Sequence, residues 1–179
     1  GKNLGALQFD GANDYVQVAN SASIDNMSNG ITISFWMNLS DRGGTDMVLL
    51  GKYWGASWAS PYYQYGIEYD ANGAKQLELL LTNAGGTLTS FSMSPGTFNT
   101  WHNVAFSYDG TNVRGYLDGV QQFSSAYSQG IPSRGQILRL GVDQTASQGY
   151  LGRLDDVRIY NRGLNASEIV QDMNAPIGN

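Results

Sequence analysis

Apolar and polar residues alternate with a period of two along most of this chain. The clearest run is Ile31–Leu39, in which every second residue is aliphatic, aromatic or methionine, and further runs cover residues 63–69, 77–81, 104–108, 138–142 and 157–159. Strict alternation indicates a strand with one buried face and one face in water, as in antiparallel sheets. About a dozen short strands are expected at the spacing of a two-sheet sandwich.

Glycine-containing turns separate these runs, and one helix is expected near the C-terminus. Asn72-Gly73, Asp109-Gly110 and Asp118-Gly119 supply the positive φ angles that tight hairpins require. Asn165 to Glu168 reads as a capping box that starts a short helix ending near Asn174. The pattern therefore predicts an all-β antiparallel sandwich with one short C-terminal helix, and residues 1–179 are expected to form a single domain.

Composition excludes several classes of protein. Only 14% of the residues are charged, the net charge is −5, and there are no cysteines. No basic cluster suits a nucleic acid, no apolar run could span a bilayer, and no thiolate could hold a metal. A neutral surface rich in hydroxyl and amide groups is common in secreted proteins that act on polysaccharides. No signal peptide is visible, so we expect a module of a larger parent protein with other domains.

Several phrases together resemble a known family. They occupy residues 6–16, 31–36, 101–110, 116–119 and 152–169, in the expected order. The chain resembles the laminin-G-like, concanavalin A-like jelly-roll family, in particular its bacterial branch related to pentraxins. The resemblance implies that the two sheets form a jelly roll. Its members include lectins, adhesion modules, appendages of glycoside hydrolases and some enzymes, so the fold does not fix the function.

Acidic residues near both ends of the chain are candidate metal ligands. Asp155 shares the parity of Val157 and Ile159, so its carboxylate is expected to point inward, where it needs a partner or a cation. Asp10, Asn13 and Asp14 lie in one loop near the other terminus. Calcium prefers such oxygen ligands, and the resemblance implies a structural calcium near these two phrases. The alternative is that Asp10 makes a turn and Asp155 caps backbone amides.

An aromatic loop is the candidate ligand-binding site. Trp54, Trp58 and Tyr62 lie in a segment rich in Gly, Ala, Ser and Pro between two strands, where exposed rings would suit stacking on a sugar. The alternative is a small satellite core that folds over the edge of a sheet. Trp36 lies on the face of its strand opposite Phe35 and could line a groove or be covered by a loop.

Evidence for catalysis is weak. His102 is the only histidine, and a lone histidine with the parity of strand residues is expected to be structural. Glycosidases need two carboxyl groups at a defined separation. Glu68 and Asp70 share one face of a strand, but the Glu-x-Asp-x-x-Glu pattern of related enzymes is absent.

These observations favour a non-catalytic carbohydrate-binding, lectin-like module of a secreted or cell-surface bacterial protein. Its expected partner is a polysaccharide or oligosaccharide, bound by Trp54, Trp58 and Tyr62, and a structural calcium would mainly fix the loops. One alternative is an adhesion or architectural module whose aromatic loop contacts protein. Another is a small hydrolase or lyase that uses Glu68 and Asp70.

Overall fold

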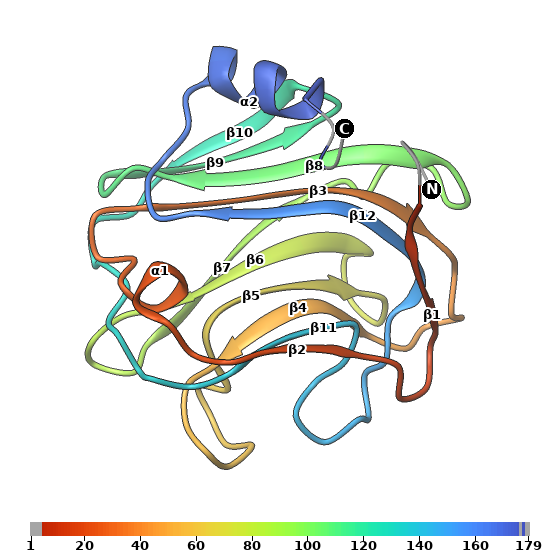
Figure 1. Cartoon of the computed structure of the whole chain (residues 1–179), viewed down its shortest axis with the longest axis horizontal. Helices are drawn as coiled ribbons and strands as arrows, with labels where there is room; N and C mark the ends of the chain where they lie inside the picture. Colours follow the sequence, from red (N-terminus) through yellow and green to blue (C-terminus); the bar gives the residue numbers. More distant parts are fainter. Residues whose placement is uncertain (1–4, 176, 178–179) are drawn as a thin grey trace.

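The protein is a sandwich of two six-stranded antiparallel sheets (Figure 1). A computed structural model describes residues 5–175 and residue 177. The first sheet has the spatial order β1 (Leu7–Asp10), β12 (Leu151–Tyr160), β3 (Ile31–Leu39), β8 (Trp101–Tyr108), β9 (Asn112–Leu117) and β10 (Val120–Ala126). The second has the order β2 (Val16–Val18), β11 (Leu138–Leu140), β4 (Met47–Tyr53), β5 (Tyr63–Asp70), β6 (Gln76–Thr82) and β7 (Leu88–Met93). The predicted all-β jelly-roll sandwich is confirmed.

Alternation along the strands builds the core between the sheets. On β5, Tyr65, Ile67 and Tyr69 are buried in the main core. The intervening residues of β5, among them Gly66 and Glu68, point to the outer face of the second sheet. Residues on that outer face do not pack in the core between the sheets, so they are available to form a binding site.

The strand β12 breaks the alternation in its middle. Leu154 is in the core, and Asp155 pairs with Trp36 on the opposite face of the first sheet. The register then shifts before Arg158, and Asp156 takes a φ of 48°. The expected inward carboxylate of Asp155 is therefore wrong, because an extra residue in β12 separates its parity from that of Val157.

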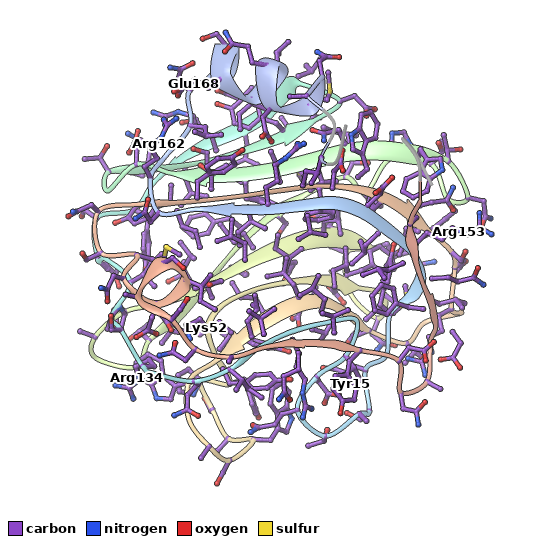
Figure 2. The ribbon with its side chains drawn as sticks, viewed as in Figure 1. Tyr15, Lys52, Arg134, Arg153, Arg162 and Glu168 are labelled. Carbon is purple, nitrogen blue, oxygen red and sulfur yellow. The ribbon has the colours of Figure 1, made fainter. Side chains whose placement is uncertain are left out.

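The C-terminal helix α2 (Ala166–Met173) forms as predicted and covers part of the outer face of the first sheet (Figure 1). The Asn165 side chain accepts from the Glu168 N–H at 3.0 Å, and the Glu168 carboxylate accepts from the Asn165 N–H at 2.9 Å. Ile169 packs with Tyr116 in a small buried cluster. A salt bridge of 2.8 Å joins Arg162 to Glu168 at the start of the helix (Figure 2).

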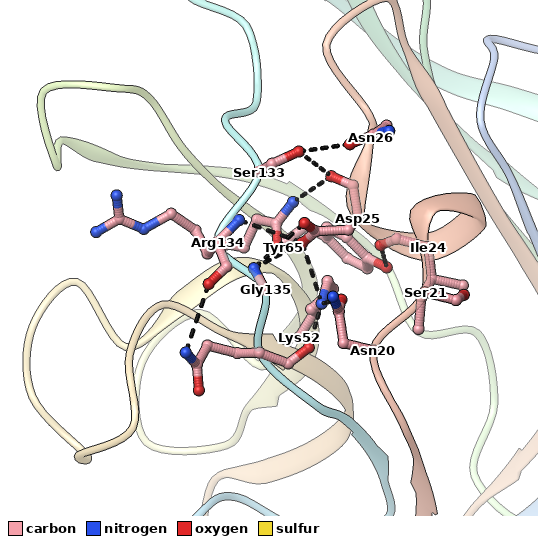
Figure 3. A network of polar contacts seen from close by, with 12 residues as sticks. Asn20, Ser21, Ile24, Asp25, Asn26, Lys52, Tyr65, Ser133, Arg134 and Gly135 are labelled. Carbon is pink, nitrogen blue, oxygen red and sulfur yellow. Dashed lines mark hydrogen bonds and ion pairs between the residues drawn. The ribbon is translucent and has the colours of Figure 1, made fainter.

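A second, shorter helix, α1 (Ala22–Asp25), was not predicted. It closes one end of the sandwich, where the Tyr65 hydroxyl donates to the Ile24 carbonyl at 2.7 Å. Beneath it lies Lys52, whose side chain is fully buried and whose Nζ is 3.2 Å from Asp25 (Figure 3). Lys52 also donates to the Asn20 side chain at 2.7 Å. This buried pair ties α1 to the centre of the second sheet.

Candidate functional site

The loop over residues 54–62 hangs from the outer side of the second sheet, beside the segment over residues 141–150 (Figure 1). Trp58 is half-buried and packs against a second small apolar cluster made of Val48, Tyr53, Tyr63 and Leu80. The satellite core that we considered as an alternative therefore exists. It anchors Trp58 without burying it completely.

The tyrosine Tyr63 lies flat on the sheet because two glycines face each other beneath it. Gly51 and Gly66 are direct cross-strand partners on β4 and β5. A Cβ atom at Gly51 would be 2.5 Å from the Tyr63 ring, and one at Gly66 would be 3.2 Å from it. The glycine pair thus provides the space in which an aromatic ring covers the sheet.

A pocket of about 350 Å³ opens at this place, and we call it the aromatic groove. Its lining residues are Trp58, Tyr62, Tyr63, Glu68, Leu80, Leu88, Ser147 and Gln148. The centroids of the Trp58 and Tyr62 rings are 4.7 Å apart, and those of Trp58 and Tyr63 are 5.3 Å apart with planes at 77°. Tyr62 is 39% exposed, so it remains accessible to a ligand.

Two polar groups of the aromatic groove, the Glu68 carboxyl and the Tyr63 hydroxyl, are in unfavourable environments. Burial, followed by repulsion from Glu78, Asp46 and Asp70, raises the pKa of Glu68 to about 7. The Tyr63 hydroxyl is buried and has no hydrogen-bond partner among the described residues. Buried polar atoms without partners are uncommon in proteins.

The Ser147–Gln148 side of the groove is held by Asp143. This fully buried carboxylate accepts from the N–H groups of Ser147 at 2.7 Å and Gln148 at 3.1 Å. Burial acts to raise the pKa of Asp143, but hydrogen bonds from Thr145, Gln148 and Ser147 outweigh it and lower the pKa. Sequence reasoning missed Ser147 and Gln148, because only the folded chain brings their loop beside residues 54–62.

Two of the four predicted aromatic ligands lie elsewhere. Trp54 is covered by Arg134, whose guanidinium carbon is 3.6 Å from the ring centroid. Trp36 is on the first sheet, opposite Asp155. The structure therefore brings together Trp58 and Tyr62 and separates Trp54 and Trp36 from them. Tyr63, which was not among the predicted ligands, lines the groove as well.

The predicted metal ligands do not form one cluster. Asp10 pairs with Leu151, four residues along β12 from Asp155, which is about 13 Å. Asp10 accepts from the Ala12 N–H at 2.8 Å, and Asp14 accepts from the Asp10 N–H at 3.1 Å, so both carboxylates brace their own loop. Among the described residues, no group of three acidic or histidine side chains is placed to hold an ion.

The geometry of Asp10, Asn13, Asp14 and Asp155 therefore does not fit a single calcium shared between the two ends of the chain. Asp155 accepts from the Asp156 N–H at 3.0 Å, as the turn-capping alternative expected. Asp10 and Asp14 keep further carboxylate oxygens, and Asn13 lies between them. A calcium ion held by that loop alone stays a prediction.

Two of the residues considered for catalysis, His102 and Asp70, make hydrogen bonds that stabilise turns and loops. His102 Nδ1 is 2.8 Å from Asp118, and its Nε2 accepts from the Thr97 N–H at 3.0 Å, so the ring links two loops. Asp70 accepts from the N–H groups of Gly73 at 2.7 Å and Ala74 at 3.0 Å. Glu68 is thereby left beside Glu78, its direct partner on β6, rather than beside a free Asp70.

The structure is thus a sandwich of two antiparallel sheets with an aromatic pocket on one outer face. Residues 10–170 match a family model described as the concanavalin A-like lectin/glucanases superfamily. The chain belongs to this superfamily. No curated protein matches the chain in sequence.

Solved structures with the same fold include three toxin domains. The receptor binding domain of botulinum neurotoxin C/D mosaic serotype is similar with a TM-score of 0.71 and 14% identity, covering 92% of this chain and 41% of that one. The binding domain of Paraclostridial Mosquitocidal Protein 1 gives 0.70 and 17%, covering 91% and 42%. The botulinum neurotoxin serotype G binding domain gives 0.66 and 14%, covering 94% and 46%. This chain therefore spans less than half the length of these domains.

Proposed function

We propose that this protein is a non-catalytic carbohydrate-binding module of a secreted or cell-surface bacterial protein. The observation that carries the proposal is the aromatic groove, in which the exposed Tyr62 and the half-buried Trp58 stand beside Glu68. Aromatic rings present rigid apolar faces to the C–H face of a sugar. The carboxylate of Glu68 and the side chains of Ser147 and Gln148 supply acceptors and donors for hydroxyl groups.

The fold and its neighbours support a binding role over catalysis. The superfamily contains lectins, and the similar toxin domains are described as binding domains. Asp70, the expected catalytic partner of Glu68, has both carboxylate oxygens engaged by backbone N–H groups. A partner sugar chain would hold a larger parent protein close to a polysaccharide.

Calcium would act on the loops around the groove in this proposal. Gly149 follows Gln148 and packs so closely that a Cβ atom there would be 2.6 Å from the carbonyl oxygens of Gly11 and Ala12. An ion held by Asp10, Asn13 and Asp14 would therefore stiffen the loop that supports the Ser147–Gln148 side. Its role would be structural.

A second candidate is an adhesion or architectural module that uses the same rings to contact protein. The receptor-binding descriptions of the similar toxin domains favour it. Rings such as Trp58 and Tyr62 are also common at protein interfaces. The two candidates differ in the ligand and agree on the surface.

Affinity gel electrophoresis with a panel of soluble polysaccharides tests the proposal. We expect at least one polysaccharide to retard the wild-type protein, and Trp58→Ala to abolish the retardation. Tyr15→Ala is the matched control, because Tyr15 is 53% exposed and lies outside the groove lining (Figure 2). Retardation that survives Trp58→Ala, or a folded wild-type protein that no glycan retards, would remove the proposal in favour of a protein partner.

A further inference from the structure

The aromatic groove has the composition of a site for a cation. Three rings, those of Trp58, Tyr62 and Tyr63, line one pocket together with a single carboxylate, that of Glu68. The Trp58 ring lies close to both of the others, with centroid distances of 4.7 Å to Tyr62 and 5.3 Å to Tyr63. Aromatic faces attract ammonium groups, and cages of such rings are a known means of holding them.

The carboxylate of Glu68 has no positive partner. No hydrogen bond or ion pair of its side chain occurs within the described residues, and the groove lining contains no Lys, Arg or His. The charged groups that raise its pKa are all acidic: Glu78 opposite it on β6, Asp46 just before β4, and Asp70 on its own strand. Glu78 already accepts from the Ser92 hydroxyl at 3.1 Å.

A partly buried carboxylate among like charges is costly for the folded protein, and a bound cation can relieve this cost. The raised pKa of Glu68, caused first by burial and then by its acidic neighbours, is consistent with this deficit. The hydroxyl of Tyr63, which also lines the groove, is buried and has no hydrogen-bond partner among the described residues. Glu68 and the rings of Trp58, Tyr62 and Tyr63 line the same pocket.

Resting on the proposed carbohydrate function, we propose that the aromatic groove recognises a glycan through a protonated amino group. The ligand class is a polymer of 2-amino-2-deoxyhexose, whose ammonium group pairs with Glu68 and contacts the rings of Trp58 and Tyr62. A groove of about 350 Å³ suits one or two sugar units. Uronate and sulfated polysaccharides are excluded, because their charge repels Glu68 and its acidic neighbours.

Isothermal titration calorimetry at pH 7 with three hexasaccharides tests the inference. The probes share a β-1,4-linked backbone and differ at C2: glucosamine, N-acetylglucosamine and glucose. We expect the glucosamine hexamer to bind at least about tenfold more tightly than the other two, and Glu68→Gln to remove the preference. Glu168→Gln is the matched control, since it changes the same residue type on α2 and glutamine also serves in a capping box.

Salt dependence gives a second measurement that needs no variant. Raising sodium chloride from about 0.05 to about 0.5 M should weaken binding of the glucosamine hexamer and leave any binding of the glucose hexamer unchanged. Equal or tighter binding of the neutral hexamers would overturn the amino-sugar inference while the proposed function stands. Absence of binding by every hexamer, together with no retardation by any polysaccharide, would overturn both.

Discussion

The ring of Tyr62 lies with its centroid 4.7 Å from that of Trp58, and its backbone takes a φ of 65° to place it there. A positive φ is uncommon for a tyrosine and costs about 1 kcal/mol or more. The backbone is held by two hydrogen bonds of 2.8 Å, from the Tyr62 N–H to Ala59 and from the Trp54 N–H to Tyr62. The loop therefore maintains an unfavourable conformation that presents an exposed ring.

This relationship predicts that Tyr62→Gly separates binding from stability. Glycine adopts the positive φ without strain, and the loss of a half-exposed ring costs about as much as the strain that is removed. The free energy of unfolding, measured in urea, should change by less than about 1 kcal/mol, while glycan retardation is lost. A strongly destabilised Tyr62→Gly protein would show that the ring serves the core instead.

The glycine pair beneath Tyr63 predicts a variant that loses both stability and binding. In Gly51→Ala, the new methyl group would meet the Tyr63 ring at 2.5 Å and push it into the groove. We expect a loss of stability of about 1–3 kcal/mol because the site is overpacked. Glycan binding should be weaker because the displaced Tyr63 ring changes the shape of the groove. Gly55→Ala is the control, since a Cβ atom there meets nothing within 4 Å. Equal effects of the two variants would contradict the packing described for Tyr63.

The buried Lys52–Asp25 pair predicts a large effect on stability away from the groove. Burial lowers the pKa of Lys52, and Asp25 partly offsets this. Burial also acts to raise the pKa of Asp25, but N–H donors from Gly135 and Arg134 together with Lys52 lower it. Lys52→Met leaves that carboxylate without its cation and should cost about 3–5 kcal/mol in urea unfolding.

The exposed Lys75 is the matched control for this substitution. Lys75→Met should change the unfolding free energy by less than about 0.5 kcal/mol. A similar small effect of Lys52→Met would show that the pair does not hold α1 against the second sheet.

Glu68 predicts a pH dependence of stability with a definite sign. Its pKa is raised from 4.5 to about 7 in the folded protein, so the folded state binds more protons than the unfolded state between these values. The unfolding free energy should therefore fall as pH rises from about 4.5 to about 7, by at most about 3 kcal/mol. Glu68→Gln should flatten this window relative to wild type, and an unchanged slope would contradict the raised pKa of this carboxyl group.

Metal removal tests the remaining calcium prediction. EDTA should lower the melting temperature, and calcium should restore it, because an ion that binds only the folded state stabilises it by mass action. Asp10→Asn combined with Asp14→Asn should abolish the response. Asp155→Asn should leave it intact, since Asp155 lies four residues along β12 from Leu151, the partner of Asp10. No response of the wild-type protein to either addition would remove calcium from the account.

Most of the fold could be predicted from the sequence, because local patterns determine most of its strands and its C-terminal helix. Alternation in Ile31–Leu39 and the capping box at Asn165 each specify one element without reference to distant residues. The bulge in β12 escaped prediction because a one-residue insertion leaves no local signal in the composition. It reversed the expected direction of Asp155. The helix α1 has only four residues, too few to show a periodicity.

The candidate site was only partly predictable, because it depends on tertiary contacts. The aromatic composition of residues 54–62 pointed to Trp58 and Tyr62. Nothing in the sequence showed that Arg134 would cover Trp54. The role of Tyr63 depends on two glycines that meet across strands, and the Ser147–Gln148 side depends on a buried aspartate. Long-range pairings of this kind are set by the folded sheet.

The most direct test of the groove is a ¹H–¹⁵N NMR titration of the folded protein with the glycan that retards it in affinity gels, or with the glucosamine hexamer. We expect the resonances of the Trp58 indole N–H and of the backbone amides of Tyr62, Glu68 and Gln148 to shift together with one saturation curve, while that of the Trp36 indole N–H does not shift. Shifts centred on Trp36 and the outer face of the first sheet, with no change at Trp58, would contradict it.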